Sequence, residues 1–223
     1  MQKRISKKII LYLSILLLLT TPNNKKFLKF NLTKELGFEI SSSSEFNDKK
    51  IISELSSYKN QNLFFLNKEK IREIIKKYKI IEDYNIYKNY PSNLIVKFKK
   101  TQFLAITQKE GSNYYIGSNG KFIKIKNDAE DLPIIFGTVD TMEFLRLKNL
   151  IDNSIFDFSN IKNLYYFKSK RWDIETKDGF LLKLPKDNLS KSFELFIDII
   201  NNKNFQNSNI IDLRQSNQII LNG

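Results

Sequence analysis

The feature that most constrains the fold is a change of hydrophobic period within residues 62–105. Its first half has apolar residues at the i, i+3, i+4 and i+7 spacing of a helical stripe, namely Ile71, Ile74, Ile75 and Tyr78. Beyond them, apolar and polar residues alternate as in half-buried strands, with Tyr84 and Ile86 before a turn at 89–93 and Leu94, Val96 and Phe98 after it. The stretch predicts a helix followed by a two-strand hairpin.

Two residues mark the ends of these elements. Asn67 stands before the helical stripe, where a short polar side chain accepts a hydrogen bond from a free N–H of the first turn. Pro91 stands inside the turn at 89–93, where its fixed φ angle favours the reversal of the chain.

The residues before this stretch complete a larger unit. Alternation at Phe38 and Ile40 predicts a first strand, and a second helix begins at Asn47 or Asp48. Its apolar side consists of Ile51, Ile52, Leu55 and Tyr58. The order from residue 36 to residue 105 is therefore strand, helix, helix, strand, strand.

The residues after 105 predict a second, β-rich domain. Hairpins are expected around Asn119-Gly120 within 114–123 and around 177–179, where the latter joins two strands in 165–184. Residues 131–137 read as an extended loop, 141–151 and 188–202 as helices, and 209–221 as one or two strands. The last helix has Leu189, Phe193, Phe196, Ile197 and Ile200 on one face, which Leu195 and Ile199 widen beyond the usual stripe.

The N-terminus has the pattern of a membrane-targeting segment. Basic residues within 1–8 precede an apolar run from Ile9, which ends before Pro22. A cleaved signal peptide and an uncleaved anchor both fit this pattern. We favour the anchor, because no small-x-small cleavage site follows and lysines on both flanks can extend the span. The basic end would lie in the cytoplasm.

The composition excludes several function classes. The chain has no Cys and no His, so it lacks the commonest nucleophile–base pairs and the commonest metal ligands. No phosphate-binding glycine loop is present. The net charge of +13 favours nucleic-acid binding, but the lysines are spread along the whole chain and Arg is scarce. We therefore expect no catalytic residue, metal, cofactor, small-molecule substrate or nucleic acid.

Five short stretches, taken in order, resemble one family. They are Asn62-Leu63-Phe64-Phe65-Leu66-Asn67, Tyr90-Pro91-Ser92-Asn93-Leu94-Ile95-Val96, Leu132-Pro133-Ile134-Ile135-Phe136-Gly137, Arg171-Trp172-Asp173-Ile174 with Gly179 and Leu184-Pro185, and Ile211-Asp212-Leu213-Arg214. Behind a signal anchor, they resemble the bacterial cell-division family FtsQ/DivIB. The first strand departs from the family pattern, because Ile40-Ser41-Ser42 stands where a Val-x-Gly is usual, and the anchor is short.

The resemblance implies an α+β fold in five parts. These are a cytoplasmic tail at 1–8, a transmembrane signal anchor at 9–21, a linker at 22–35, a POTRA domain (β-α-α-β-β) at 36–105, and a β domain at 106–223 with a mixed or antiparallel sheet and a C-terminal helix. It implies a single-pass inner-membrane protein of the division septum, with periplasmic domains and no enzymatic activity. The alternative is a POTRA-containing periplasmic chaperone or outer-membrane assembly module.

The resemblance also implies the partners and the residues that bind them. The partners are the division proteins FtsB and FtsL, and further FtsK, FtsW and FtsI. A mechanism of partner binding follows from the chemistry of sheet edges, since a terminal edge strand offers unpaired N–H and C=O groups to an extended segment of a partner. The candidate partner-binding residues are Leu195, Ile199, Ile210, Ile211, Asp212, Leu213, Arg214, Ile219 and Ile220, although each can instead complete the core. Pro91, Arg171, Trp172 and Gly179 are expected to be structural, with Trp172 as a core residue.

Overall fold

A computed structural model of the 223-residue chain describes residues 7–20, 37–42, 49–59, 61–125, 131–201, 209–215 and 218–222. The first helix, α1, spans Lys7–Thr20 and so begins two residues before the expected anchor at 9–21 and ends one residue before its end. Among the helices of the described ranges, none is long and apolar enough to cross a membrane. The expected transmembrane span is therefore not confirmed.

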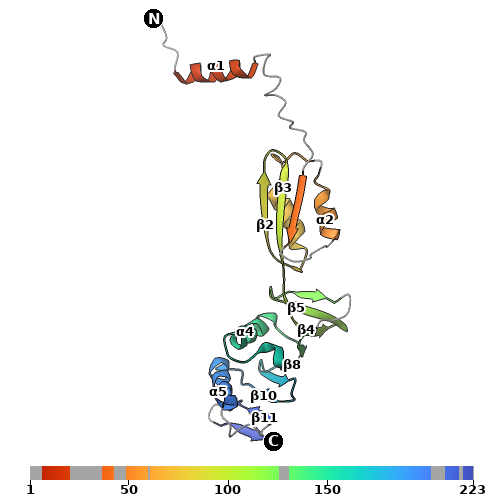
Figure 1. Cartoon of the computed structure of the whole chain (residues 1–223), viewed down its shortest axis with the longest axis vertical. Coiled ribbons are helices and arrows are strands. Elements are labelled where there is room, and N and C mark those ends of the chain that lie inside the picture. Colours follow the sequence, from red (N-terminus) through yellow and green to blue (C-terminus); the bar gives the residue numbers. More distant parts are fainter. Residues whose placement is uncertain are drawn as a thin grey trace. The chain divides into compact units, whose positions relative to one another are not determined.

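The chain divides into two compact units. The first comprises Met1–Ser41, Asn47–Ile75 and Asn85–Lys97, and the second comprises Ser42–Phe46, Lys76–Tyr84 and Phe98–Gly223. The first unit holds most of a three-stranded sheet, of which residues 81–84 and 98–100 fall in the second unit, and the second unit holds a larger sheet; the two sheets are drawn in yellow to orange and in green to blue in Figure 1.

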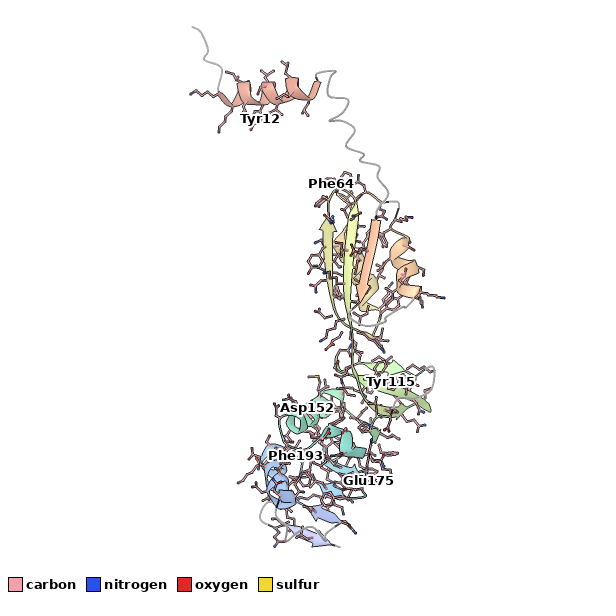
Figure 2. All side chains as sticks on the ribbon, in the orientation of Figure 1. Tyr12, Phe64, Tyr115, Asp152, Glu175 and Phe193 are labelled. Atoms are coloured by element: carbon pink, nitrogen blue, oxygen red, sulfur yellow. The ribbon has the colours of Figure 1, made fainter. Side chains whose placement is uncertain are left out.

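The first sheet confirms the predicted strand-helix-helix-strand-strand order. Its strands β1 (Gly37–Ser42), β2 (Ile81–Asn89) and β3 (Asn93–Lys100) lie in the order β1-β3-β2. The helices are α2 (Lys49–Ser56) and α3 (Lys68–Lys76). Of the predicted stripes, Ile52 is exposed and Ile74 and Tyr78 are half-buried. The buried apolar side chains are Ile51, Leu55, Ile71, Ile75, Leu94, Val96 and Phe98 from the predicted stripes, with Leu63, Leu66 and Ile81 in addition. Phe64, in the loop between α2 and α3, lies at one end of this sheet (Figure 2).

The predicted cap of α3 is formed. The Oδ1 atom of Asn67 accepts a hydrogen bond of 2.9 Å from the backbone N–H of Glu69, which otherwise has no partner within the helix. This bond fixes the first residue of α3 and so the position at which its stripe of isoleucines meets the core.

Asn67→Ala should lower the free energy of unfolding by about 1 kcal/mol, the usual effect of losing such a cap. Urea denaturation followed by far-UV circular dichroism measures it. Asn67→Asp is the matched control, because it keeps the acceptor and should stay within a few tenths of a kcal/mol of the parent. Equal losses in both variants would contradict the capping role.

The second unit contains a nine-stranded mixed sheet with the order β12-β11-β10-β9-β8-β7-β4-β5-β6. The strands are β4 (Phe103–Lys109), β5 (Ser112–Gly117), β6 (Phe122–Lys124), β7 (Ile134–Phe136), β8 (Ile161–Tyr166), β9 (Trp172–Thr176), β10 (Leu181–Lys183), β11 (Ile210–Asp212) and β12 (Ile220–Asn222). The helices α4 (Thr141–Asp152) and α5 (Leu189–Asn201) lie on the same side of it (Figure 1), and a 3₁₀ turn, η2, spans Phe158–Asn160.

One expectation for this unit is wrong. The stretch 131–137 is not a loop, because its centre forms β7, which pairs in parallel with both β4 and β8. The two strands expected within 165–184 and joined at 177–179 are present as β9 and β10, while β8, which begins before this region at Ile161, was not expected. The predicted hairpin turns at Gly120 and Gly179 are present, and both glycines have positive φ angles.

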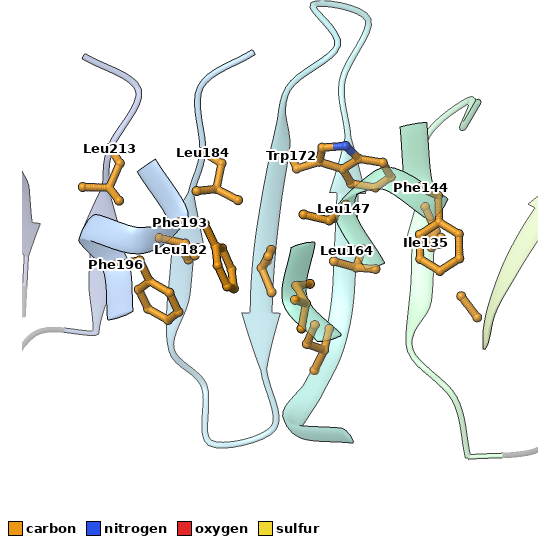
Figure 3. Packing of buried hydrophobic residues seen from close by; sticks show 14 of the residues in the cluster. Ile135, Phe144, Leu147, Leu164, Trp172, Leu182, Leu184, Phe193, Phe196 and Leu213 are labelled. Atoms are coloured by element: carbon orange, nitrogen blue, oxygen red, sulfur yellow. The ribbon is translucent and has the colours of Figure 1, made fainter. Parts of the chain in front are cut away.

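One hydrophobic core fills the space between the sheet and the two helices (Figure 3). The sheet contributes Leu164, Trp172 and Leu182 among others, and the helices contribute Phe144 and Leu147 from α4 and Phe193 and Phe196 from α5. The predicted face of α5 is rotated in the structure, because Ile199 is buried while Ile200 is exposed. Seven apolar residues in thirteen positions leave the buried face of this helix undetermined by pattern alone.

Candidate protein-interaction site

The strand β12 forms one end of the nine-stranded sheet. It pairs with β11 in antiparallel register, with Ile220 opposite Asp212 and Leu221 opposite Ile211. Leu221 packs against the core, whereas Ile220 is 40% exposed and Ile219, just before the strand, is 42% exposed. Within the described part of the chain, β12 has β11 as its neighbour in the sheet and none beyond it. Its outer edge therefore offers backbone groups to a further strand.

The neighbouring strand β11 is mostly internal. Ile211 and Leu213 are 1% and 3% exposed and belong to the core cluster, while Ile210 is half-buried. Ile199 on α5 is buried as well, at 4%. These three core side chains position the edge and offer almost no surface of their own to a partner. Among the apolar candidates, Leu195, Ile219 and Ile220 are the exposed ones.

A groove of about 1030 Å³ lies beside this edge. It is formed where β9 begins, where β10 and β11 end, and along the first half of α5. Four of the predicted residues line it, namely Leu195, Leu213, Arg214 and Ile219. The structure thus brings together one side of α5 and the residues on either side of the turn between β11 and β12.

Arg171 also lines the groove, and so do several charged residues that pattern reasoning missed. They are Lys186, Asp187, Lys191, Glu194 and Asp198. Their positions on α5 and in the loop before it carry no sequence signal, because charged residues on an exposed helix face are ordinary. The groove therefore mixes both signs of charge.

Asp212 and Arg214 form one rigid arrangement. The Asp212 carboxylate accepts a hydrogen bond from the backbone N–H of Arg214 at 3.1 Å and two more from its Nε at 2.8 and 2.9 Å, and Nη2 of Arg214 donates to it as well. The hydrogen bonds from Arg214 lower the pKa of Asp212, and those to Asp212 raise the pKa of Arg214. These hydrogen bonds hold the Arg214 guanidinium against Asp212 where Arg214 lines the groove.

Asp173 lies in register with Lys183, which in turn lies in register with Asp212, so the three side chains form a row across β9, β10 and β11. Asp173 is 7% exposed, and its Oδ1 atom has no hydrogen-bond partner among the described residues. Burial raises the pKa of Asp173, and Arg171 is the strongest of the positive charges that oppose the rise. Both groove arginines therefore stand near a carboxylate of the sheet.

A third carboxylate on this face of the sheet, that of Glu175, is also held by hydrogen bonds. Glu175 accepts from the Asn163 amide at 3.0 Å and from the Tyr165 hydroxyl at 2.6 Å. These bonds, of which the one from Asn163 has the largest effect, lower the pKa of Glu175, and the bond to Glu175 raises the pKa of Tyr165.

Outside this face, the bonds from Ser159 lower the pKa of Asp157 at the start of η2, and burial raises the pKa of Tyr166. In the described ranges no three acidic residues come together as a metal site.

The four residues expected to be structural lie in different settings. Trp172 is 2% exposed, and its ring centroid lies 4.6 Å from that of Tyr166 and 6.5 Å from that of Phe144, which confirms it as a core residue. The Arg171 guanidinium lies 4.2 Å from the centroid of the Phe167 ring. Gly179 is in the β9–β10 turn and Pro91 is in the exposed β2–β3 turn.

These features define a class of protein. A small unit of one sheet and two helices precedes a mixed-sheet unit that ends in an exposed edge strand. Two family models match the same two regions of the chain, "POTRA domain, FtsQ-type" at residues 38–99 and "Cell division protein FtsQ/DivIB, C-terminal" at residues 105–214. The chain belongs to the FtsQ/DivIB family of cell-division proteins.

Curated relatives carry the same name. The "Cell division protein FtsQ" of Rickettsia bellii is 27% identical over 207 residues, which cover 86% of this chain and 76% of the relative. That of Rickettsia conorii is 23% identical over 85% of this chain and 74% of its own. That of Bradyrhizobium diazoefficiens is 25% identical over 60% of this chain and 40% of its own.

A solved structure is also similar, the major extracytoplasmic domain of the trans isomer of DivIB from Geobacillus stearothermophilus. It aligns with 41% of this chain and 84% of its own length, at 12% identity and a TM-score of 0.32. That score is low, so the family assignment stands on the sequence relatives and the two family models.

Proposed function

We propose that this protein is a non-enzymatic scaffold of the cell-division machinery. Its folded units would hold other division proteins, FtsB and FtsL in the first place and further FtsK, FtsW and FtsI, next to the enzymes of septal peptidoglycan synthesis. Membership of a cell-division family supports this role. The composition agrees with it, because a chain without His and Cys lacks the usual means of catalysis.

One observation carries the proposal, namely the position of β12 at the end of the sheet. An extended segment of a partner would pair with its outer edge and continue the sheet, so that main-chain hydrogen bonds supply affinity. The side chains of Ile219 and Ile220, both exposed, would contact the neighbouring side chains of that segment.

The groove next to the edge would hold the continuation of the partner segment. Leu195 supplies an exposed apolar contact there, and Arg214, fixed by Asp212, supplies an oriented guanidinium. A partner that runs from the edge into the groove would thus contact both a backbone surface and a side-chain surface. Two such surfaces in series discriminate better than a sheet edge alone, since any extended chain can pair with an edge.

The proposal includes a location and a domain plan. Residues 1–8 would form a cytoplasmic tail, 9–21 an anchor in the inner membrane and 22–35 a linker, and the units at 36–105 and 106–223 would lie in the periplasm at the division septum. The apolar run with lysines on both flanks supports the anchor.

The experiment is a proline substitution at Ile219 or at Ile220, tested for FtsB binding by pull-down and titration. Successive N–H groups of an edge strand point alternately towards the neighbouring strand and away from it, so a proline at one of these adjacent positions removes an outward donor. Loss of that bond, with a carbonyl of the partner left unpaired, should weaken binding by about tenfold to a hundredfold.

Ile219→Ala and Ile220→Ala are the matched controls. They shorten the same side chains but keep the N–H groups, so they should lose less affinity than the proline variants. Circular dichroism and the emission of the buried Trp172 establish that each variant is folded. Undiminished FtsB binding by both folded proline variants would remove the edge strand from the proposed mechanism.

A further inference from the structure

The end of the first unit carries an exposed cluster of aromatic rings. Phe65 is 87% exposed, and Phe64, Tyr87 and Tyr90 are each about half exposed, at 51%, 50% and 53%. The rings of Phe64 and Tyr90 lie 4.8 Å apart between their centroids. We call these four residues, together with Lys68 and Lys88, the aromatic tip. Figure 2 shows Phe64 at this end of the sheet.

The aromatic tip combines its rings with positive charge. Lys68 and Lys88 line a shallow hollow with Tyr87 and Tyr90, and the Lys68 ammonium donates to the Ile86 carbonyl at 3.3 Å. The Lys97 ammonium lies 5.9 Å from the centroid of the Tyr87 ring. The two segments that build the tip, residues 59–68 and 84–93, contain no Asp or Glu. The neighbouring acid, Glu69, is paired with Arg72.

Such a surface is unusual for a water-exposed turn. Single exposed apolar side chains are common, but four aromatic rings with lysines and no acids in one place indicate a binding surface. Tyrosine side chains, which join an apolar ring to a polar hydroxyl, favour the boundary between water and lipid, and lysines are attracted to anionic headgroups.

The chain enters the first sheet at this same end. The Gly37 N–H, at the start of β1, donates to the Ser92 carbonyl at 2.8 Å, next to Tyr90 and Pro91 in the β2–β3 turn. Residues 21–36 join this point to the end of α1, and a chain of that length spans at most roughly 55 Å even when fully extended. The aromatic tip is thus tethered directly to the apolar N-terminal segment.

We propose that the aromatic tip binds the surface of an anionic membrane. Phe64 and Phe65 would enter the boundary between headgroups and acyl chains, with Tyr87 and Tyr90 beside them and the lysines against lipid phosphates. The inference rests on the proposed anchoring of residues 9–21. It adds a second contact that would fix the orientation of the first unit, which a tether alone does not do.

The test uses the full chain with single cysteines, because the protein has none of its own. Gln61→Cys places a polarity-sensitive fluorophore at the aromatic tip, and Asp83→Cys places it on β2, six residues before the turn end of that strand. Both positions are exposed. Each labelled protein is mixed with vesicles of phosphatidylcholine, either alone or with phosphatidylglycerol, and vesicle flotation measures binding.

In the anionic vesicles the emission at position 61 should shift to the blue, while that at position 83 should not. Phe65→Ser should abolish most of the shift, and high salt should weaken it by screening the lysines. Ile52→Ser is the matched control, since it removes another exposed apolar side chain of the same unit, on α2, and should leave the shift unchanged.

The outcomes separate this inference from the proposed anchor. Flotation with neutral vesicles but no shift at position 61 in anionic ones would keep the anchor and overturn membrane binding by the tip. Flotation with anionic vesicles alone, lost in Phe65→Ser, would keep the tip and overturn the anchor. A shift at position 61 that needs another division protein would assign the tip to a protein partner instead. Failure to float with either vesicle would overturn both.

Discussion

Gly137→Ala is expected to prevent stable folding of the second unit. Gly137 directly follows β7 and has a φ angle of +101°, and a Cβ atom built there would lie 2.1 Å from the carbonyl oxygen of Tyr166. The obstacle is backbone, at the end of β8, which pairs with β7 in register. Relief would require separating the two strands, so we expect a loss above about 4 kcal/mol.

Gly179→Ala is the matched control. Gly179 also has a positive φ angle, +89°, but a Cβ atom there would meet nothing within 4 Å. Gly179→Ala should lower the free energy of unfolding only by the cost of a non-glycine residue at a positive φ angle, about 1–2 kcal/mol. Denaturant unfolding followed by the fluorescence of Trp172, the single tryptophan, measures both variants. Equal losses would show that strain at φ > 0, and not the clash with Tyr166, decides the effect.

Trp172→Ala should be the second most damaging change, with a loss of about 3–5 kcal/mol. The side chain is 2% exposed and lies between Tyr166 of β8 and Phe144 of α4, so its removal leaves a cavity where the sheet meets a helix. Urea unfolding followed by far-UV circular dichroism is the measurement, since the variant has no tryptophan emission.

Phe136→Ala is the control for this substitution. Phe136 is also a large aromatic residue of the same sheet, stacked on Tyr165 at 5.2 Å between centroids, but it is 46% exposed. Its loss should be well below that of Trp172→Ala, because water can fill the space that its ring leaves. A loss as large as that of Trp172→Ala would contradict the core assignment of the tryptophan.

Local patterns in the sequence predicted the first unit well. The Asn67 cap, the isoleucine stripe of α3 and the alternation in β3 are each decided by residues a few positions apart, and all three are present. The second unit was predicted less well. The strand β7 has three residues between Pro133 and Gly137, too few to establish a period, so pairing with distant strands and not local pattern makes it a strand.

The candidate site was predictable only in part. The expected edge is present at β12, which stands at one end of the sheet order, but not at 210–213, because β11 lies between β10 and β12. The exposure of individual residues was not accessible, since Ile199 and Ile200 have the same chemistry and differ only in how α5 is rotated against the sheet. The role of Asp212 as a support for Arg214 required side-chain geometry that no pattern in the sequence encodes.

The short length of β7 affects how the second unit would respond to a pulling force on the chain. It joins two antiparallel groups of strands, β4-β5-β6 and β8-β9-β10, through two register pairs on one side and three on the other. The first group supplies few residues to the shared core, chiefly Leu104, Ala105 and Ile116. A pulling force that reaches β4 would therefore open the sheet along β7 before it reached β12. The pairs that β7 makes with its neighbours would separate first, and β12 would stay paired with β11 while the other end of the sheet opens.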